Sequence, residues 1–327
     1  MLLNIVYIIL GIALVIWGAD RLTEGASSLA RGMRVPEIVI GLTIVAAGTS
    51  APELFVSLVS ALKGTSDLAV GNVIGSNIFN TALIVGCSAV LAPMAVAKST
   101  VKKDMPWAAM SAFLLFLLCF DDMNSPHLWG NEISRSDGVV LLVGFLAFMI
   151  YTFNAANKDG LMPSEEELED LHEMPKDYSR LGVNIMWIVV GLGCLVFGSD
   201  LFVDAASYVA HRYGIRQSVV GLTIVAGGTS LPELATSVVA AYKGRSAIAI
   251  GNVIGSNVFN ILLILGLTAV VHPMRIMGIT IVDLTMMLVS MGLLWMFAFT
   301  KYYVSRREGF VLITGFLAYM GWLLYLL

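Results

Sequence analysis

Long apolar stretches separated by short polar connections run along the whole chain. A helix that spans a bilayer needs about 20 predominantly apolar residues. Most of the apolar stretches reach this length, and the fourth is short. The pattern therefore predicts an all-α membrane protein with ten transmembrane helices, at residues 2–19, 36–62, 68–92, 105–120, 137–154, 183–200, 217–241, 248–271, 279–299 and 310–327.

The same cassette of polar and apolar positions occurs twice, 180 residues apart. Residues 41–94 align with residues 221–274 without a gap, and 35 of the 54 positions are identical. The repeat continues outside the cassette, since GFLAFM at 144–149 matches GFLAYM at 315–320. Each half of the chain is therefore predicted to contain five helices.

An odd number of spans in each half makes the second half enter the membrane from the opposite side. We expect two inverted five-helix repeats, at residues 1–154 and 182–327, with the substrate site near the midplane where they meet. The one long polar connection, residues 155–181, is rich in acidic residues and is predicted to be a cytoplasmic linker.

Composition agrees with a membrane protein, because 58% of the residues are hydrophobic and only 13% are charged. The net charge of −4 is distributed over connecting loops, and nothing in it suggests nucleic-acid binding. Three cysteines fall in apolar segments, which argues against a disulfide framework. The N-terminal stretch has no basic region before its apolar run and is interpreted as a first spanning helix.

Lysine and arginine are distributed unequally between the two sets of loops. Loops after the odd-numbered helices carry 14 of these residues, and the other loops carry five. Because basic residues concentrate on the cytoplasmic side, the odd loops are predicted to be cytoplasmic. Both termini then lie outside the plasma (inner) membrane.

Two prolines fall inside predicted spanning helices. Pro52 lies in the second helix and Pro232 in the seventh, and each removes an amide donor and clashes with the carbonyl four residues earlier. We expect both helices to be broken there, with free carbonyls at residues 46–48 and 226–228. Such carbonyls are tolerated at membrane depth only where protein, water or an ion satisfies them.

The side chains around each break provide oxygen atoms and no sulfur or imidazole. Calcium and sodium prefer oxygen ligands, whereas zinc and copper sites differ. Three or four residues separate the oxygen-bearing residues within each helix, so they share a face. The candidate ligands are Thr49, Ser50, Glu53, Ser76 and Asn80 in the first half, and Thr229, Ser230, Glu233, Ser256 and Asn260 in the second.

Glu53 and Glu233 are the most informative of these residues. An acid at the centre of a spanning helix costs about 2.5–3.5 kcal/mol, and no predicted membrane Lys or Arg is placed to pair with it. Individual hydroxyls can instead bond to their own helix, and the repeated glycines fit close helix packing. Asn72 and Asn252 lie one turn from the candidate serines and are expected to support them. Asp20 and Asp200 are expected at helix ends facing solvent.

The motifs GTSAPE…GNVIGSNIFN and GTSLPE…GNVIGSNVFN closely resemble the two repeats of the cation/calcium antiporter superfamily, which includes the sodium/calcium exchangers. The resemblance implies a 5+5 inverted-repeat fold and alternating access, in which helices 1 and 6 slide across the other eight. It implies calcium and sodium as transported ions. The sequence itself offers no nucleophile–base or metal-ligand constellation of an enzyme, so we expect no enzymatic activity and no cofactor. The resemblance also adds backbone carbonyls at Ala46 and Ala226 to the ten candidate ligands above.

The coupling ion and the mode of transport remain open at the level of sequence. The favoured interpretation is export of calcium in exchange for sodium, and calcium/proton exchange is an alternative because two adjacent carboxyls can bind protons. A passive cation channel is less favoured, since it needs no inverted pair of acid-bearing helices. Asn260 is Asp in some relatives, including potassium-dependent ones, so Asn here weakens a potassium-dependent mechanism. Nothing in the sequence indicates an oligomeric state.

Overall fold

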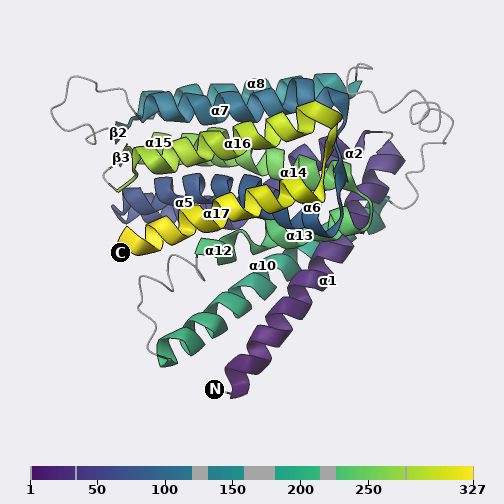
Figure 1. Cartoon of the computed structure of the whole chain (residues 1–327), viewed down its shortest axis with the longest axis horizontal. Coiled ribbons are helices and arrows are strands. Elements are labelled where there is room, and N and C mark those ends of the chain that lie inside the picture. The colour runs from purple at the N-terminus through teal and green to yellow at the C-terminus, as the bar shows by residue number, and fades with distance from the viewer. Residues whose placement is uncertain are drawn as a thin grey trace.

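The structure is a computed structural model of the 327-residue chain. Almost all described residues belong to helices, and four two-residue strands connect them (Figure 1). The predicted linker at 155–181 lies almost entirely outside the described residues, so that prediction stays untested. The structure describes residues 2–33, 35–119, 132–157, 181–213, 226–276 and 278–326.

The first half of the chain contains α-helices, three π-helical stretches (labelled η) and two strands. In chain order these are α1 (Leu2–Met33), α2 (Glu37–Ile40), η1 (Gly41–Val45), α3 (Ala46–Thr49), α4 (Ala51–Leu62), α5 (Ser66–Ile78), η2 (Phe79–Ile84), α6 (Val85–Leu91), β1 (Met94–Ala95), η3 (Thr100–Asp104), α7 (Met105–Leu118), β2 (Glu132–Ile133) and α8 (Arg135–Asn157).

The second half follows a similar order over its described residues, without a π-helical stretch that matches η3. Its elements are α10 (Leu181–Arg212), α12 (Ala226–Thr229), α13 (Leu231–Tyr242), α14 (Ser246–Val258), η5 (Phe259–Leu265), α15 (Gly266–Val271), β3 (Met274–Arg275), α16 (Ile281–Lys301), β4 (Tyr303–Val304) and α17 (Arg306–Leu326).

Seven helices in the described part of the chain are long and apolar enough to cross a membrane, or eight if the bent pair Glu37–Thr49 and Ala51–Leu62 counts as one span. These coincide with eight of the ten predicted segments. The predicted fourth segment corresponds to α7, which has 14 residues and follows directly on the π-helical η3. The predicted seventh corresponds to α12 and α13, and its first part lies outside the described residues.

The first and sixth helices are much longer than the sequence suggested. Both α1 and α10 contain 32 residues and continue well past the predicted ends at residues 19 and 200. The expectation that Asp20 and Asp200 lie at helix ends is therefore wrong. In α1 the extension is stabilised by ion pairs that Arg21 makes with its neighbour Asp20 and, one turn on, with Glu24.

Local signals in the sequence set several helix starts and turns. A capping box begins α16, since the Thr280 hydroxyl accepts from the Asp283 amide and the Asp283 carboxylate accepts from the Thr280 amide. The turns after α4 and α13 each contain a glycine in the left-handed region, Gly64 (φ 76°) and Gly244 (φ 74°). Only glycine adopts this conformation without strain, so both turns are short and fixed.

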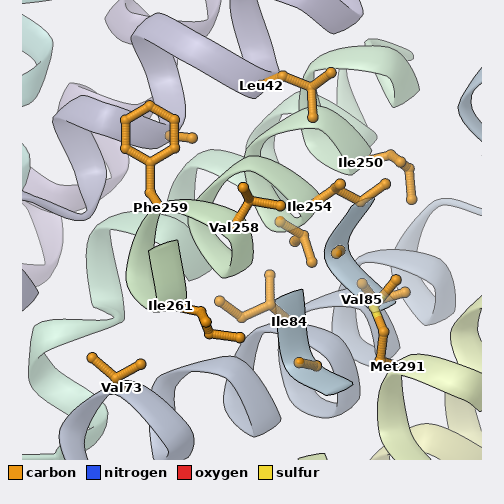
Figure 2. Packing of buried hydrophobic residues seen from close by; sticks show 14 of the residues in the cluster. Leu42, Val73, Ile84, Val85, Ile250, Ile254, Val258, Phe259, Ile261 and Met291 are labelled. Atoms are coloured by element: carbon orange, nitrogen blue, oxygen red, sulfur yellow. The ribbon is translucent and has the colours of Figure 1, made fainter. Parts of the chain in front are cut away.

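Two continuous helical segments form the centre of the molecule. In the span Ser246–Val271, 83% of the most apolar 18-residue stretch is buried inside the protein. The corresponding value is 72% for Ser66–Leu91 and only 22% for Leu3–Met33. Figure 2 shows the packing between these segments, where Ile84, Ile254 and Val258 come together. The two central segments carry the GNVIGSN motifs, so the motifs lie at the middle of the protein rather than facing lipid.

Many contacts recur with the two halves exchanged. Strand β1 pairs antiparallel with β4, and β2 pairs antiparallel with β3. Gly86 approaches Gly309, and the matching Gly266 approaches Gly138. Each half therefore completes its partner through equivalent positions.

Helices α1 and α10 pack face to face through glycines and run side by side at one edge of the molecule, inclined to the remaining helices (Figure 1). A Cβ atom added at Gly11 would lie 2.7 Å from the carbonyl oxygen of Gly198, and one added at Gly18 would lie 2.7 Å from that of Gly191. Because the earlier glycine of α1 meets the later glycine of α10, the two helices run antiparallel.

We expect Gly191→Ala to lower the unfolding temperature, and Gly193→Ala, in the same helix, to leave it unchanged or raise it. A Cβ at Gly191 would lie 2.7 Å from the Leu22 amide nitrogen, whereas a Cβ at Gly193 meets nothing within 4 Å. Overpacking of this kind costs about 1–3 kcal/mol, while alanine at an open helical site adds about 0.5–1 kcal/mol of stability. Thermal unfolding in detergent measures both, and equal shifts would contradict the close packing of α1 on α10.

Candidate functional site

The second and seventh helices bend at a serine that precedes the proline. The two parts of the second helix, Glu37–Thr49 and Ala51–Leu62, meet at 45°. Ser50 has φ −83° and ψ 7°, and Ser230, at the matching position, has φ −92° and ψ 9°. Proline at the first turn of a new helix is well tolerated because its missing amide would be unpaired there. The bends therefore start two new helices, α4 and α13, inside the protein.

The bend is tighter than the unwound stretch that the sequence suggested. Helical residues flank Ser50 on both sides, and the Ser50 amide donates to the Ala46 carbonyl at 3.0 Å. The Thr49 hydroxyl also approaches the Ala46 carbonyl, at 3.4 Å. The expectation of a free carbonyl at Ala46 is thus wrong, although a carbonyl oxygen keeps a second lone pair. The side chain of Ala226 lies outside the described residues.

Glu53 and Glu233 occupy the first turns of the helices that begin at the bends. Each side chain is only 1% exposed. The serine at each bend bonds to the glutamate of the other half: Ser50 Oγ donates to Glu233 Oε1, and Ser230 Oγ donates to Glu53 Oε1, both at 3.0 Å. The halves thus meet at a paired acid site.

The predicted supporting asparagines hold the backbone of the two acidic helices. Asn72 Nδ2 donates to the Glu53 carbonyl at 3.3 Å, and Asn252 Nδ2 donates to the Glu233 carbonyl at 3.4 Å. The Thr49 hydroxyl donates to Asn252 Oδ1 at 3.1 Å. These bonds tie the central helices α5 and α14 to α4 and α13, so the acids sit on a rigid frame.

Asn80 and Asn260 are held in a fixed orientation by two further asparagines. Asn80 Nδ2 donates to Asn257 Oδ1 at 3.1 Å, and Asn260 Nδ2 donates to Asn77 Oδ1 at 3.0 Å. Each bond crosses between halves. Since the amide nitrogen is engaged, the side-chain oxygen of Asn80 and of Asn260 is left to accept from another group or to bind a cation.

Asn77 and Asn257 were missed as functional residues at the level of sequence. Each directly follows a candidate serine, within the repeated segment GSNIFN or GSNVFN, and each is less than 5% exposed. The available signal was an amide side chain repeated at the same place in both apolar helices. The π-helical stretches η2 and η5 begin two residues later, and such stretches occur often at functional sites.

Several buried oxygen atoms in this region accept no hydrogen bond from any described residue. Both halves of the chain contribute such atoms, and one oxygen of each carboxylate is among them. A set of acceptors with two negative charges, and without a positively charged side chain bonded to it, suits a hard cation. These atoms are Glu53 Oε2, Asn80 Oδ1, Glu233 Oε2, Ser256 Oγ and Asn260 Oδ1.

Most of the remaining predicted ligands lie in the same region. Ser76 Oγ lies 3.2 Å from Ser230 Oγ, and the Ser76 side chain is 4% exposed. Thr229 ends α12 and directly precedes Ser230, which donates to Glu53 Oε1. Within the described ranges, no three His, Cys, Asp or Glu side chains gather, so the acids of the site are two. Hydroxyls, amides and carbonyls would supply the other ligands.

The sequence pattern of the sodium/calcium exchanger protein family matches residues 3–154 and 183–325, which is most of the chain. The chain belongs to this family. The resemblance to cation/calcium antiporters that the two motifs indicated is thereby confirmed. The protein is a multi-pass membrane transporter of the antiporter type, not an enzyme.

Individual relatives and structures agree with this assignment. The chain is 32% identical to the sodium/calcium exchanger MaX1 of Methanosarcina acetivorans, and the match covers 99% of both proteins. It is 35% identical to the inner membrane protein YrbG of Escherichia coli over 84% of this chain and 81% of that protein. The fold matches the sodium–calcium exchanger NCX_Mj with a TM-score of 0.82 at 28% identity, covering 98% of both chains.

If the candidate site binds calcium, we expect Glu53→Gln and Glu233→Gln each to lower calcium affinity by about a hundredfold or more, because each removes one of the two buried charges of the site. Glutamine has nearly the same shape and still accepts a bond from Ser230 or Ser50, so the fold should survive. Calorimetric titration of the purified proteins with calcium measures the loss. The matched control is Glu132→Gln, which alters an exposed pair with Arg275. Wild-type affinity in either site variant would remove that glutamate from the site.

Proposed function

We propose that the protein is a secondary antiporter that exports calcium from the cytoplasm in exchange for sodium. The observation that carries this proposal is the pair of buried glutamates, Glu53 and Glu233, each bonded to a serine of the other half and each with one unpaired oxygen. Two ionised carboxylates neutralise one calcium ion. MaX1, which matches over its whole length, is a sodium/calcium exchanger by name, and this supports sodium as the coupling ion.

The proposed architecture is ten transmembrane helices in two inverted five-helix repeats, residues 1–154 and 182–327, joined by a cytoplasmic linker at 155–181. The antiparallel packing of α1 and α10, each the first helix of its half, supports the inversion. The excess of basic residues in the odd-numbered loops supports termini outside the plasma (inner) membrane. In this arrangement the acid pair lies near the midplane, where both sides can reach it in turn.

The proposed ligands come equally from both halves. The glutamates carry the charge, and hydroxyl, amide and carbonyl oxygens complete the coordination of calcium, which takes six to eight oxygens. Sodium ions would use overlapping sets of the same oxygens, so the two substrates compete. The set is Ala46, Thr49, Ser50, Glu53, Ser76 and Asn80 with Ala226, Thr229, Ser230, Glu233, Ser256 and Asn260.

Proton coupling is the second candidate mechanism, and the same two carboxyls favour it. The site contains no bonded cationic side chain among the described residues, so each glutamate can be neutralised by a proton as well as by a metal ion. Two protons would then replace one calcium ion without net charge transfer at the site.

A transport experiment separates the two mechanisms. Purified protein in sealed vesicles should take up calcium when an outward sodium gradient is imposed at equal pH on both sides. The vesicles should take up little calcium when an outward proton gradient is imposed without sodium. In the proposed mechanism sodium, and not the proton, binds to the oxygens that calcium has left. Vesicles with the Glu53→Gln variant serve as the control for leakage. Uptake that follows the pH gradient and ignores sodium would establish calcium/proton exchange instead.

Asn260→Asp should change the ion requirement. It would add a third carboxylate to a site whose charge is set by two, and an uncompensated charge in a buried site is costly. The variant must bind an additional cation or a proton, so we expect an altered sodium dependence or a steeper pH dependence, while wild-type flux needs no potassium. Sodium-driven calcium flux in both proteins, with and without potassium, tests this. Potassium dependence of the wild type would contradict the assignment of Asn260 as a neutral ligand.

A further inference from the structure

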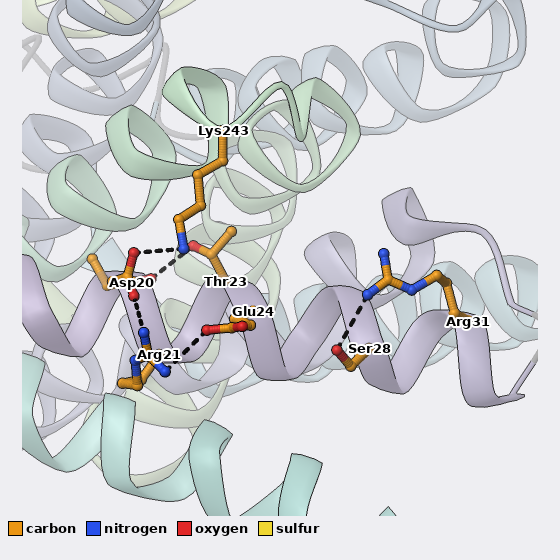
Figure 3. A network of polar contacts seen from close by, with 8 residues as sticks. Asp20, Arg21, Thr23, Glu24, Ser28, Arg31 and Lys243 are labelled. Carbon is orange, nitrogen blue, oxygen red and sulfur yellow. Dashed lines mark hydrogen bonds and ion pairs between the residues drawn. The ribbon is translucent and has the colours of Figure 1, made fainter. Parts of the chain in front are cut away.

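Outside the candidate site, an ion pair joins α1 to the end of α13. Lys243 Nζ lies 2.5 Å from Asp20 Oδ1, and the other oxygen of Asp20 accepts from Arg21 at 2.6 Å. Figure 3 shows Lys243 reaching from its own helix to Asp20 on α1. The side chains of Lys243 and Asp20 are 35% and 28% exposed, so the pair is partly shielded from solvent.

A second ion pair joins α2 to the residue before α14 and, unlike the first pair, has no charged equivalent in the other half of the sequence. Arg245 Nη1 lies 3.1 Å from Glu37 Oε1, and the Ser27 hydroxyl of α1 donates to the same carboxylate. In the other half of the sequence the positions of Glu37 and Arg245 are occupied by Gln217 and Thr65. This pair therefore has no charged counterpart, whereas both partners of the Asp20–Lys243 pair are repeated.

The Asp20–Lys243 pair connects the helix pair α1 and α10 to helix α13. Asp20 belongs to α1, which packs on α10 through glycine backbones and forms a unit with it. Lys243 directly follows α13, the helix whose first turn carries Glu233. The pair thus fastens the α1–α10 unit to the helix that carries half of the acid site.

The repeat provides an internal comparison for this pair. Contacts such as Gly11–Gly198 and the serine–glutamate bonds occur twice, with the halves exchanged. In the same alignment Asp20 corresponds to Asp200, and Lys243 corresponds to Lys63. Both of these residues are exposed, and in the described part of the chain neither takes part in an ion pair. The charge pair is therefore repeated in the sequence but formed on one side only.

We infer that Asp20–Lys243 and Asp200–Lys63 are alternative latches that set which side of the membrane the acid site opens to. The inference rests on the proposed antiport function, since an antiporter must expose one site to each side in turn. In an inverted repeat, the opposite access state is produced when the two halves exchange conformations. The contact that now joins Asp20 to Lys243 then forms between Asp200 and Lys63, and the first pair opens.

The size of the effect follows from the exposure of the pair. Partly exposed ion pairs shift an equilibrium by roughly two- to fivefold. A shift of this size biases the access equilibrium and still lets thermal motion reverse it, which a transporter requires. The two latches act in opposite directions, and this opposition is what separates them from ion pairs that only stabilise the fold.

The test measures the distance between α1 and the other helices directly. Spin labels are attached at Ile16 of α1 and at Leu91 of α6, both exposed, after the three native cysteines are replaced. Pulsed electron paramagnetic resonance then gives the populations of the two arrangements. Lys243→Met should lower the population of the arrangement described here by roughly two- to fivefold relative to the other. Lys63→Met should raise it.

Three further proteins make the result decisive. Asp20→Asn breaks the same ion pair by removing the charge of Asp20, and it should act like Lys243→Met. It provides the same test if Lys243→Met folds poorly. Lys243→Arg keeps the charge and should behave like wild type. Arg275→Met removes an exposed pair that does not involve α1 and should change nothing.

The latch is refuted if the Lys243 and Lys63 variants shift the populations in the same direction, or if neither shifts them. Because the distances are measured without a sodium gradient, they are independent of the coupling ion. A wild-type protein that failed to exchange sodium for calcium would refute the proposed function. Opposite shifts in the same samples would still support the latch.

Discussion

The rest of the structure depends on the placement of two carboxylates in an apolar interior, where no basic side chain of the described residues pairs with them. An isolated acid at this depth costs about 2.5–3.5 kcal/mol, and the two repel each other in addition. Each bend starts a new helix just before its glutamate, so the positive end of a helix dipole faces each acid. A serine of the other half donates to each one. The other oxygen of each carboxylate has no hydrogen-bond partner among the described residues, and the proposed cation would bind there.

The crosswise bonds make each half incomplete alone. Glu53 needs Ser230, and Asn80 needs Asn257, so separating the halves would expose or orphan buried polar groups. This dependence also explains why the two central segments are the most buried of the candidate membrane spans in the described part of the chain. They must face each other closely for the asparagine amides to reach across, and the apolar contacts around Ile254 and Val258 hold them at that distance.

Much of the candidate site could be predicted from sequence because its residues break a strong rule. An acid, an amide or a proline inside an apolar helix is unfavourable without a partner, so Glu53, Asn72 and Pro52 could be recognised in a single repeat. Asn77 and Asn257 could not be assigned in this way. Their partners lie 183 and 177 residues away, and only the folded chain shows that they orient the ligands.

Helix boundaries were less predictable, for a different physical reason. Residues after position 19 are polar enough to resemble a loop, yet α1 continues to Met33 because ion pairs along one face and contacts with α13 stabilise it. The carbonyl of Ala46 was expected to be free because a proline was assumed to unwind several residues. The chain instead changes direction at Ser50 alone and keeps the Ala46 bond.

A transport site must bind its ion and also release it, and the geometry reconciles these demands. The groups that orient the ligands are bonded to one another, as in the amide pairs between Asn80 and Asn257 and between Asn260 and Asn77, and these bonds do not involve the ion. Under the proposed function, only oxygens without a partner in this frame, such as Glu53 Oε2 and Glu233 Oε2, would change partner when the ion leaves. The frame is therefore already ordered before binding, and little conformational entropy is lost when an ion enters. Within the described residues the frame carries two carboxylates, Glu53 and Glu233, so the competition between divalent and monovalent ions proposed above would be decided by these two charges.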